Sequence, residues 1–124
     1  MSDKLIKLMR EQRMSWLDLD ADATPQKRVR IIRPTEYEMA ETFVKGGQIR
    51  IGFAEACRFV VDWQGFSEAD LLGAAVGSSD PLPFTQALWA EVLGDHIKWV
   101  PVVTQALMDA AVTHQKKLSD DAKN

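Results

Sequence analysis

The sequence predicts an α+β fold that is mostly α-helical, with a small N-terminal β-hairpin packed on four or five helices. Residues 14–33 hold two runs in which apolar and charged residues nearly alternate, which favours strands. Residues 35–112 hold longer apolar patterns at helical spacing, several of them preceded by capping residues. The 124 residues, 46% hydrophobic and 27% charged, have the size and composition of one folded domain. We therefore expect a single domain over residues 1–124.

The N-terminal part of the chain predicts a short helix followed by the hairpin. Residues 4–13 place four apolar residues among basic ones at helical spacing, namely Leu5, Ile6, Leu8 and Met9. The runs "SWLDLD" and "KRVRIIRP" then flank the turn-rich "ADATPQ", which is the pattern of a β-hairpin. Pro34, which has no amide proton to donate, closes the second strand. Because a lone hairpin is only marginally stable, we expect it to lie against helices.

The stretch "RPTEYEMAETF" carries the clearest helix start. Thr35 is a good N-cap, and Glu38 can bond back to the cap amide, as in a capping box. Gly46 and Gly47 follow the apolar pattern and predict the end of this helix, since glycine adopts a left-handed conformation at little cost. The sequence therefore predicts a helix that runs from Thr35 to the two glycines.

Residues 48–63 predict a second, longer helix. The alternating "IRIGF" also fits a strand, but the length of the segment favours a helix. Gly65 follows where a C-terminal cap is expected. Trp63 is therefore interpreted as a core residue and Asp62 as part of a solvated edge. The apolar residues on the predicted buried face are Phe53, Ala56, Cys57, Val60 and Trp63.

The C-terminal half predicts two capped helices, a loop and a last helix. Ser67 with Asp70 forms a weaker cap signature, and "GSSDPLP" forms the main loop. Thr85 caps the next helix, with apolar residues on either side of the cap spaced as a hydrophobic staple. The last helix is expected to begin near Pro101, which a first turn tolerates. Residues 115–124 lack apolar periodicity and predict a frayed tail.

No pattern in the sequence calls for catalysis, a cofactor or a metal. His96 and His114 have no ligand partner at metal-site spacing, and Cys57 is the single cysteine. Glu55 and Asp62 lie about two turns apart on the predicted helix, too far for a carboxylate pair. No glycine-rich phosphate loop follows a strand. We therefore expect no catalytic, cofactor-binding or metal site, and a protein that is not an enzyme.

The net charge of −3 is unevenly distributed. Residues 1–33 carry eight basic against five acidic side chains, whereas residues 51–124 carry five basic against ten acidic ones. The basic run "QKRVRIIR" could hold phosphates, but on a hairpin its arginines would face Asp18 and Asp20 of the partner strand. We favour these cross-strand ion pairs over nucleic-acid binding.

The composition also bears on location and association. No apolar stretch approaches the length of a membrane span, and the scattered charges near Met1 exclude a signal peptide. We therefore expect a cytoplasmic protein with no membrane association, since a single cysteine suits the reducing conditions there. Four tryptophans are many for one small helical layer to cover, so we expect exposed aromatic surface that serves self-association or a protein ligand.

The second half of the chain resembles small phage and prophage proteins encoded in tail modules. The residues that carry the resemblance are "VVDWQGFSEADLLG" and, after a spacer, "PLPFTQALWAEVLGDHIKWVPVVTQALMDAA". Such proteins have an apolar helix ending in a Trp-x-Gly turn, a loop, a Pro-Phe-Thr/Ser helix start and a last helix rich in Val and Ala. The segment "RVRIIRPTEYEMAE" looks like the front of the same proteins, so the resemblance covers about residues 27–112.

The resemblance implies a tail assembly chaperone. Such a chaperone is a non-enzymatic cytoplasmic protein that keeps the tape-measure protein soluble and helps recruit the major tail protein. The resemblance therefore implies the tape-measure protein and the major tail protein as partners. It also implies that the chain can form a homo-oligomer and that it binds its partners through an apolar surface. Our candidates for that surface flank the main loop: Phe66, Leu71, Leu72, Leu82, Phe84 and Trp89.

Two alternatives remain open. The chain could be a structural component of the virion, such as a head-tail connector or a minor tail protein. It could also be a small regulator that binds nucleic acid through Arg28, Arg30 and Arg33 of the hairpin.

Overall fold

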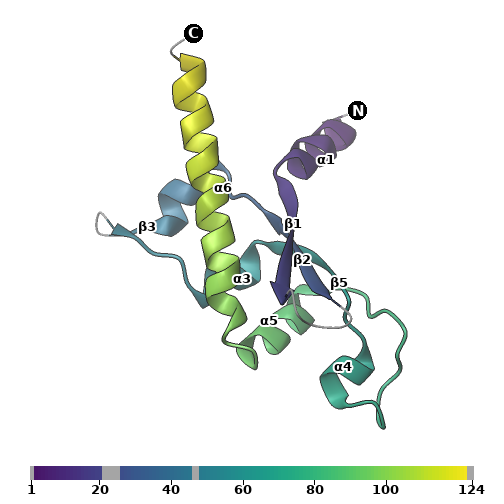
Figure 1. The fold of residues 1–124 in the computed structure, drawn as a ribbon. Helices are drawn as coiled ribbons and strands as arrows, with labels where there is room; N and C mark the ends of the chain where they lie inside the picture. The colour runs from purple at the N-terminus through teal and green to yellow at the C-terminus, as the bar shows by residue number, and fades with distance from the viewer. Residues whose placement is uncertain (1, 21–25, 46–47, 123–124) are drawn as a thin grey trace.

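A three-stranded antiparallel sheet, in the order β1-β2-β5, connects the two halves of the chain (Figure 1). The computed structural model describes residues 2–20, 26–45 and 48–122. Strand β1 (Met14–Asp20) pairs with β2 (Lys27–Ile32), as predicted for the hairpin. Strand β5 (Val60–Gln64) pairs with the other edge of β2. The fold class is α+β as expected. The sequence predicted only the two strands of the hairpin, whereas the sheet has β5 as a third strand.

The prediction of one helix over residues 48–63 is wrong. This segment divides into β4 (Gln48–Ile49), α3 (Phe53–Arg58) and β5. Val60 and Trp63 are both buried although they are three residues apart, because the pairing of β2 with β5 shifts register between Arg30 and Ile31. The irregularity in β5 therefore gives its buried residues a three-residue spacing, which a helix would also give.

Gly65 ends a strand and not a helix. Its φ is +84°, a left-handed conformation that residues with a Cβ rarely adopt. A Cβ at this position would lie 2.2 Å from the carbonyl oxygen of Gln26. The chain can therefore turn away from β5, close beside the start of β2, only with glycine here.

The predicted capping box at Thr35 is confirmed. The Thr35 hydroxyl accepts a hydrogen bond from the Glu38 amide at 3.1 Å, and Glu38 Oε1 accepts one from the Thr35 amide at 2.9 Å. The helix is shorter than predicted, because α2 (Glu36–Glu38) passes into a π-helical turn over Met39–Phe43. Strand β3 (Val44–Lys45) follows and pairs with β4. The two glycines expected to end the helix lie outside the described residues.

The capping carboxylate should make stability depend on pH. Burial raises the pKa of Glu38, but hydrogen bonds from Thr35 and the charges of Arg58 and Arg13 outweigh it and lower the pKa overall. A lowered folded-state pKa means that the ionised carboxylate stabilises the fold above the ordinary value of 4.5, and that this contribution is lost as the pH falls further.

We therefore expect Glu38→Gln to lower the free energy of unfolding by about 1 kcal/mol at neutral pH, and by less in acid. Urea denaturation at both pH values measures the difference. Glu91→Gln, on an exposed position of the fifth helix, is the matched control and should change little. An equal loss for Glu38→Gln at both pH values would contradict the assignment.

Three further helices follow the sheet: α4 (Glu68–Leu72), α5 (Gln86–Gly94) and α6 (Trp99–Ala122). The predicted caps are confirmed, because Ser67 and Asp70 form a capping box and the Thr85 hydroxyl accepts from the Leu88 amide at 3.1 Å. The core lies between the sheet and helices α3, α5 and α6. Its fully buried side chains include Val29, Val60, Trp89, Leu93, Val103 and Leu107.

Three of the four tryptophans pack in this core and do not form the expected exposed aromatic surface; in the described residues Tyr37 and Phe53 are the exposed large aromatic side chains. The indole Nε1 of Trp89 donates to the Ala56 carbonyl at 3.0 Å and joins α5 to α3. The Trp63 Nε1 donates to the Leu82 carbonyl at 2.6 Å, which holds the main loop against the sheet. Trp63 also stacks on Phe66, with ring centroids 4.3 Å apart. The interpretation of Trp63 as a core residue is confirmed.

The last helix begins near Pro101 as predicted, but it continues to Ala122, so the predicted frayed tail is wrong over residues 115–122. Its buried residues recur every fourth position: Trp99, Val103, Leu107 and Ala111. Beyond Ala111 the helix projects from the body (Figure 1). The segment "QKKLSDDA" contains no Gly or Pro and several good helix formers, so it extends a helix that packing has already nucleated.

Helix α1 (Ser2–Gln12) confirms the predicted N-terminal helix and has no buried residue. Figure 1 shows it leading into β1 and projecting from the same end of the molecule as the outer half of α6. In the described part of the chain, no helix combines the length and the apolar character that crossing a bilayer requires.

Candidate protein-binding site

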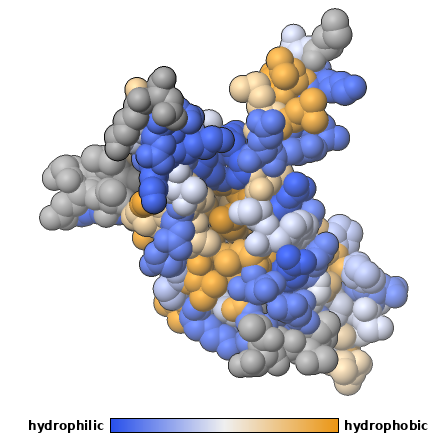
Figure 2. Space-filling view, turned by 45° about the horizontal axis from the view of Figure 1, so that its top comes forward, coloured by the Kyte–Doolittle hydropathy of each residue, from blue (hydrophilic) through white to orange (hydrophobic). Residues whose placement is uncertain are grey.

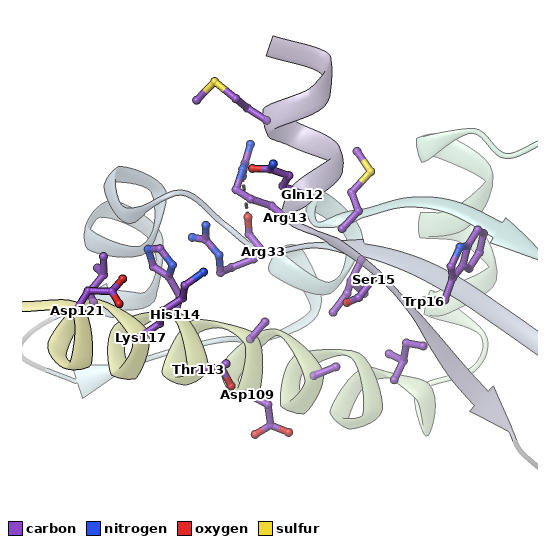
Figure 3. A pocket seen from close by; sticks show the side chains of 17 residues that line it. Gln12, Arg13, Ser15, Trp16, Arg33, Asp109, Thr113, His114, Lys117 and Asp121 are labelled. Carbon is purple, nitrogen blue, oxygen red and sulfur yellow. Dashed lines mark hydrogen bonds between the residues drawn. The ribbon is translucent and has the colours of Figure 1, made fainter. Parts of the chain in front are cut away.

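An open groove of about 1100 Å³ lies between α1, β1 and the C-terminal half of α6 (Figure 3). On the α6 side it is lined by residues three or four positions apart, among them Ala106, Ala110 and Thr113, which form one face of that helix. Their small side chains leave space beside the helix. The apolar lining residues opposite include Met9, Met14, Leu17 and Ile31. The groove therefore has small or apolar side chains on both sides, among polar and charged ones.

Basic side chains gather toward one end of this groove, where Figure 3 shows Arg13, Arg33, His114 and Lys117. Arg13 Nη1 donates to the Arg33 carbonyl at 2.7 Å, and Arg33 Nη1 donates to the Pro34 carbonyl at 2.8 Å. Burial lowers the pKa of Arg33, the nearby charge of Arg13 lowers it further, and Glu36 opposes both. The two guanidinium groups are therefore fixed by backbone carbonyls in a partly desolvated place.

The acidic groups around this end are engaged elsewhere or lie on the α6 wall. Glu36 Oε2 lies 3.0 Å from His114 Nε2, and Glu38 Oε2 pairs with Arg58 at 2.9 Å. Asp109 and Asp121 also line the groove, and Asp109 accepts a hydrogen bond from Gln105 at 2.9 Å. Among residues 2–20, 26–45 and 48–122, no carboxylate forms an ion pair with the two groove arginines or with Lys117.

Helix α1 adds an exposed apolar face next to the groove. Figure 2 shows hydrophobic residues gathered on one side of this projecting helix. Four apolar side chains in its sequence are about half exposed or more: Leu5 at 59%, Ile6 at 55%, Leu8 at 48% and Met9 at 57%. Met9 also lines the groove, so the apolar face and the groove are continuous.

The six residues proposed from the sequence as a partner surface lie elsewhere, around the main loop. Phe66 and Trp89 are buried in the core and offer no surface to a partner. Leu71, Leu82 and Phe84 are partly buried and pack against that core. Leu72 is exposed at 62%. A partner contact through this region stays a prediction, and it now depends chiefly on Leu72.

The carboxylates considered for chemistry have local structural roles. Asp62 Oδ1 accepts a hydrogen bond from the Trp63 amide at 2.8 Å. Glu55 Oε1 accepts one from the Gly52 amide at 2.7 Å, at the start of α3. Glu55 belongs to α3 and Asp62 to β5, so the expectation that they lie on one helix is wrong.

His96 contacts the α5 backbone and Trp99, whereas Cys57 lies on α3. His96 Nδ1 lies 2.8 Å from the Val92 carbonyl, and its ring stacks on Trp99 at 4.3 Å between centroids. Cys57 is partly buried on α3, and burial raises the pKa of its thiol. Within the part of the chain that the structure describes, no three His, Cys, Asp or Glu side chains are grouped to hold a metal ion.

The basic face of the hairpin is partly neutralised. Arg28 Nε pairs with Asp18 Oδ1 at 2.9 Å, which confirms one predicted cross-strand ion pair. The guanidinium groups of Arg28 and Arg30 lie 5.5 Å and 5.9 Å from the ring of Trp16. Arg33 turns into the groove and does not join them. The three arginines proposed for phosphate contacts therefore do not form one surface.

Sequence reasoning missed the groove, although one signal for it was present. In the hairpin, Met14 lies opposite Ile32, so the next pair outward is Arg13 opposite Arg33. The Arg33 amide indeed donates to the Arg13 carbonyl at 2.8 Å. The sequence prediction left open which aspartate each hairpin arginine meets, so it did not fix this register.

Comparisons of the chain with protein-family models, with curated proteins and with solved structures found no match.

Proposed function

We propose that the chain is a non-enzymatic protein-binding factor that holds an amphipathic helical segment of another protein against α1 and the groove. The observation that carries this proposal is the apolar face of α1, a helix of 11 residues with no buried residue. Isolated helices shorter than about 12–15 residues are marginal in water. A contact that covers Leu5, Ile6, Leu8 and Met9 would stabilise α1 and remove apolar surface from water.

The shape of the groove supports a helical guest. Amphipathic helices bind by laying their apolar face into an open apolar groove. The small residues on α6 give such a helix room, while Met14 and Leu17 supply an apolar wall opposite. Methionine side chains adapt to irregular partners, which suits a surface that binds unfolded or aggregation-prone chains.

The specific form of this activity that we propose is phage tail assembly chaperone. It rests on the resemblance of the chain to tail-module proteins and on the physical fit between an apolar groove and an aggregation-prone client. The client is then the tape-measure protein, with the major tail protein as a further partner. A structural virion component is the alternative, and mass spectrometry of purified particles separates the two, since a chaperone should be absent.

Co-expression with a tape-measure fragment tests the proposal. We expect the full chain to keep the fragment soluble and the double variant Leu5→Gln, Met9→Gln to lose this activity. Losing the burial of two apolar side chains should weaken binding by at least about tenfold. The variant should unfold at the same urea concentration as the parent, because α1 has no buried residue.

The control for this experiment is Lys4→Gln, which introduces the same side chain at an exposed basic position of α1. It should leave fragment solubility unchanged. Equal solubility with the double variant and the parent would remove α1 from the binding surface. No gain in solubility with the parent would overturn the chaperone assignment.

A further inference from the structure

We propose that the groove selects helical segments that carry acidic side chains beside their apolar face, with the acids bound at Arg13, Arg33 and Lys117. This inference rests on the proposed function, because it specifies the chemistry of the bound segment. The apolar side of the same segment would lie along Met14, Leu17, Ala106 and Ala110, which line the rest of the groove. The occupant is thus an acidic amphipathic helix of another protein.

Charge complementarity is the first argument. Three permanent cations line the groove, and none of them forms an ion pair with a carboxylate in the described residues; Glu36 and Glu38 act on Arg33 and Arg13 only at longer range. A partly desolvated cation without an anion is costly, and an incoming carboxylate would offset that cost. Two acids near the arginines, Glu36 and Glu38, make their short contacts with His114 and Arg58, and the groove-lining Asp109 and Asp121 form no ion pair with the three cations in the described residues.

Preorganisation is the second argument. Arg13 and Arg33 each use Nη1 on a backbone carbonyl, which fixes the guanidinium planes before a ligand arrives. A fixed guanidinium loses little side-chain entropy on binding and can bond a carboxylate through its remaining N–H groups. The two arginines therefore form a built anion-binding end, not a chance cluster of flexible side chains.

The distribution of charge along the groove sets the direction of the bound segment. Asp109 lies on α6 between Ala106 and Ala110, whereas Lys117 lies about two turns further along the helix, where Asp121 is the acidic group nearby. An acid on the guest would be repelled beside Asp109 and attracted beside Arg33. The acidic side chains of the guest should therefore be bound at the arginine end.

The experiment measures binding of labelled model helices to the full chain by fluorescence anisotropy. The probes share one apolar face of leucine and alanine and differ only in carrying glutamate, glutamine or lysine on the polar face. We expect the glutamate peptide to bind about tenfold more tightly than the glutamine peptide, and added salt to reduce that difference. The lysine peptide should bind more weakly than both.

Two adjacent lysines provide a matched pair of variants. Lys117 lines the groove, whereas Lys116 is exposed on α6 and is not among the groove-lining residues. Lys117→Glu should weaken the glutamate peptide about tenfold and leave the glutamine peptide unchanged. Lys116→Glu makes the same change in net charge and should alter neither affinity. Because both positions are exposed, neither variant should impair folding.

A second pair of variants tests the groove itself. Thr113→Phe places a large ring in the groove and should weaken every peptide, whereas Gln115→Phe, at an exposed position outside the lining, should not. Loss of binding with Thr113→Phe alone supports the groove as the binding site. Equal binding by both variants overturns it.

Failure of this inference can be told apart from failure of the proposed function. Equal affinity for glutamate and glutamine peptides, with no effect of Lys117→Glu, overturns acid selectivity while protein binding stands. No peptide binding from a chain that still keeps the tape-measure fragment soluble also overturns it. So does a dimer in sedimentation experiments that Thr113→Phe disrupts, because a second copy then occupies the groove. If the chain binds none of the peptides and does not keep the tape-measure fragment soluble, both proposals are wrong.

Discussion

Replacing Trp89 with alanine should lower the free energy of unfolding by about 3–5 kcal/mol. Trp89 is 0% exposed, so the substitution leaves a cavity where α5 packs on α3. It also removes the indole that donates to the Ala56 carbonyl at 3.0 Å, which leaves a buried acceptor unpaired. Urea denaturation followed by circular dichroism measures the loss.

Two further substitutions sharpen this expectation. Trp89→Phe retains most of the packing but not the hydrogen bond, so its loss should be smaller than that of Trp89→Ala. Trp16→Ala is the surface control, because Trp16 is only partly buried and lies beneath arginines on the hairpin. The packing shown for the core would be contradicted if Trp16→Ala cost as much as Trp89→Ala.

Replacing Gly65 with alanine should cost about 2–3 kcal/mol. The residue has a φ of +84°, and the added Cβ would come within 2.2 Å of the Gln26 carbonyl oxygen. Neither atom can move without displacing β5 from the start of β2, so the strain must be absorbed by the sheet. Thermal and urea denaturation of the variant provide the measurement.

Gly94→Ala is the matched control for that substitution. A Cβ at Gly94 would have only an ordinary contact, 3.8 Å from the ring of Phe53. Gly94 is the last residue of α5, where alanine has the higher helix propensity, so stability should stay equal or rise by up to about 1 kcal/mol. A similar loss in both variants would mean that the backbone at Gly65 is not special.

Local signals predicted the elements whose cause is local. The capping residues Thr35, Ser67 and Thr85 each began a helix where the sequence indicated, because a cap is set by a side chain and an amide three residues away. The hairpin followed from alternation on either side of a short turn-rich segment. These features need no knowledge of distant residues.

Elements set by distant contacts were predicted less well. Whether Val60 begins a strand depends on the free edge of β2, which lies nearly thirty residues earlier in the sequence, a separation that local spacing does not report. The end of α6 was missed although its cause is local. The prediction for residues 115–122 used apolar periodicity alone and did not consider their helix propensity.

The candidate site depends on both kinds of information. The apolar face of α1 was visible in the sequence as Leu5, Ile6, Leu8 and Met9, whereas the pairing of Arg13 with Arg33 follows from the hairpin register that the structure shows. That the outer half of α6 stands beside them could not be predicted, because a tail expected to fray has no defined position.

The placement of α1 and α6 also affects how the protein should be handled in the laboratory. Figure 1 shows both ends of the described chain on the same side of the molecule, where the groove opens. An affinity tag or fluorescent fusion on either end would therefore sit at the entrance and compete with any ligand. Purification handles should be cleaved before affinities are determined, and labels are better attached after α4, at the opposite end of the molecule (Figure 1).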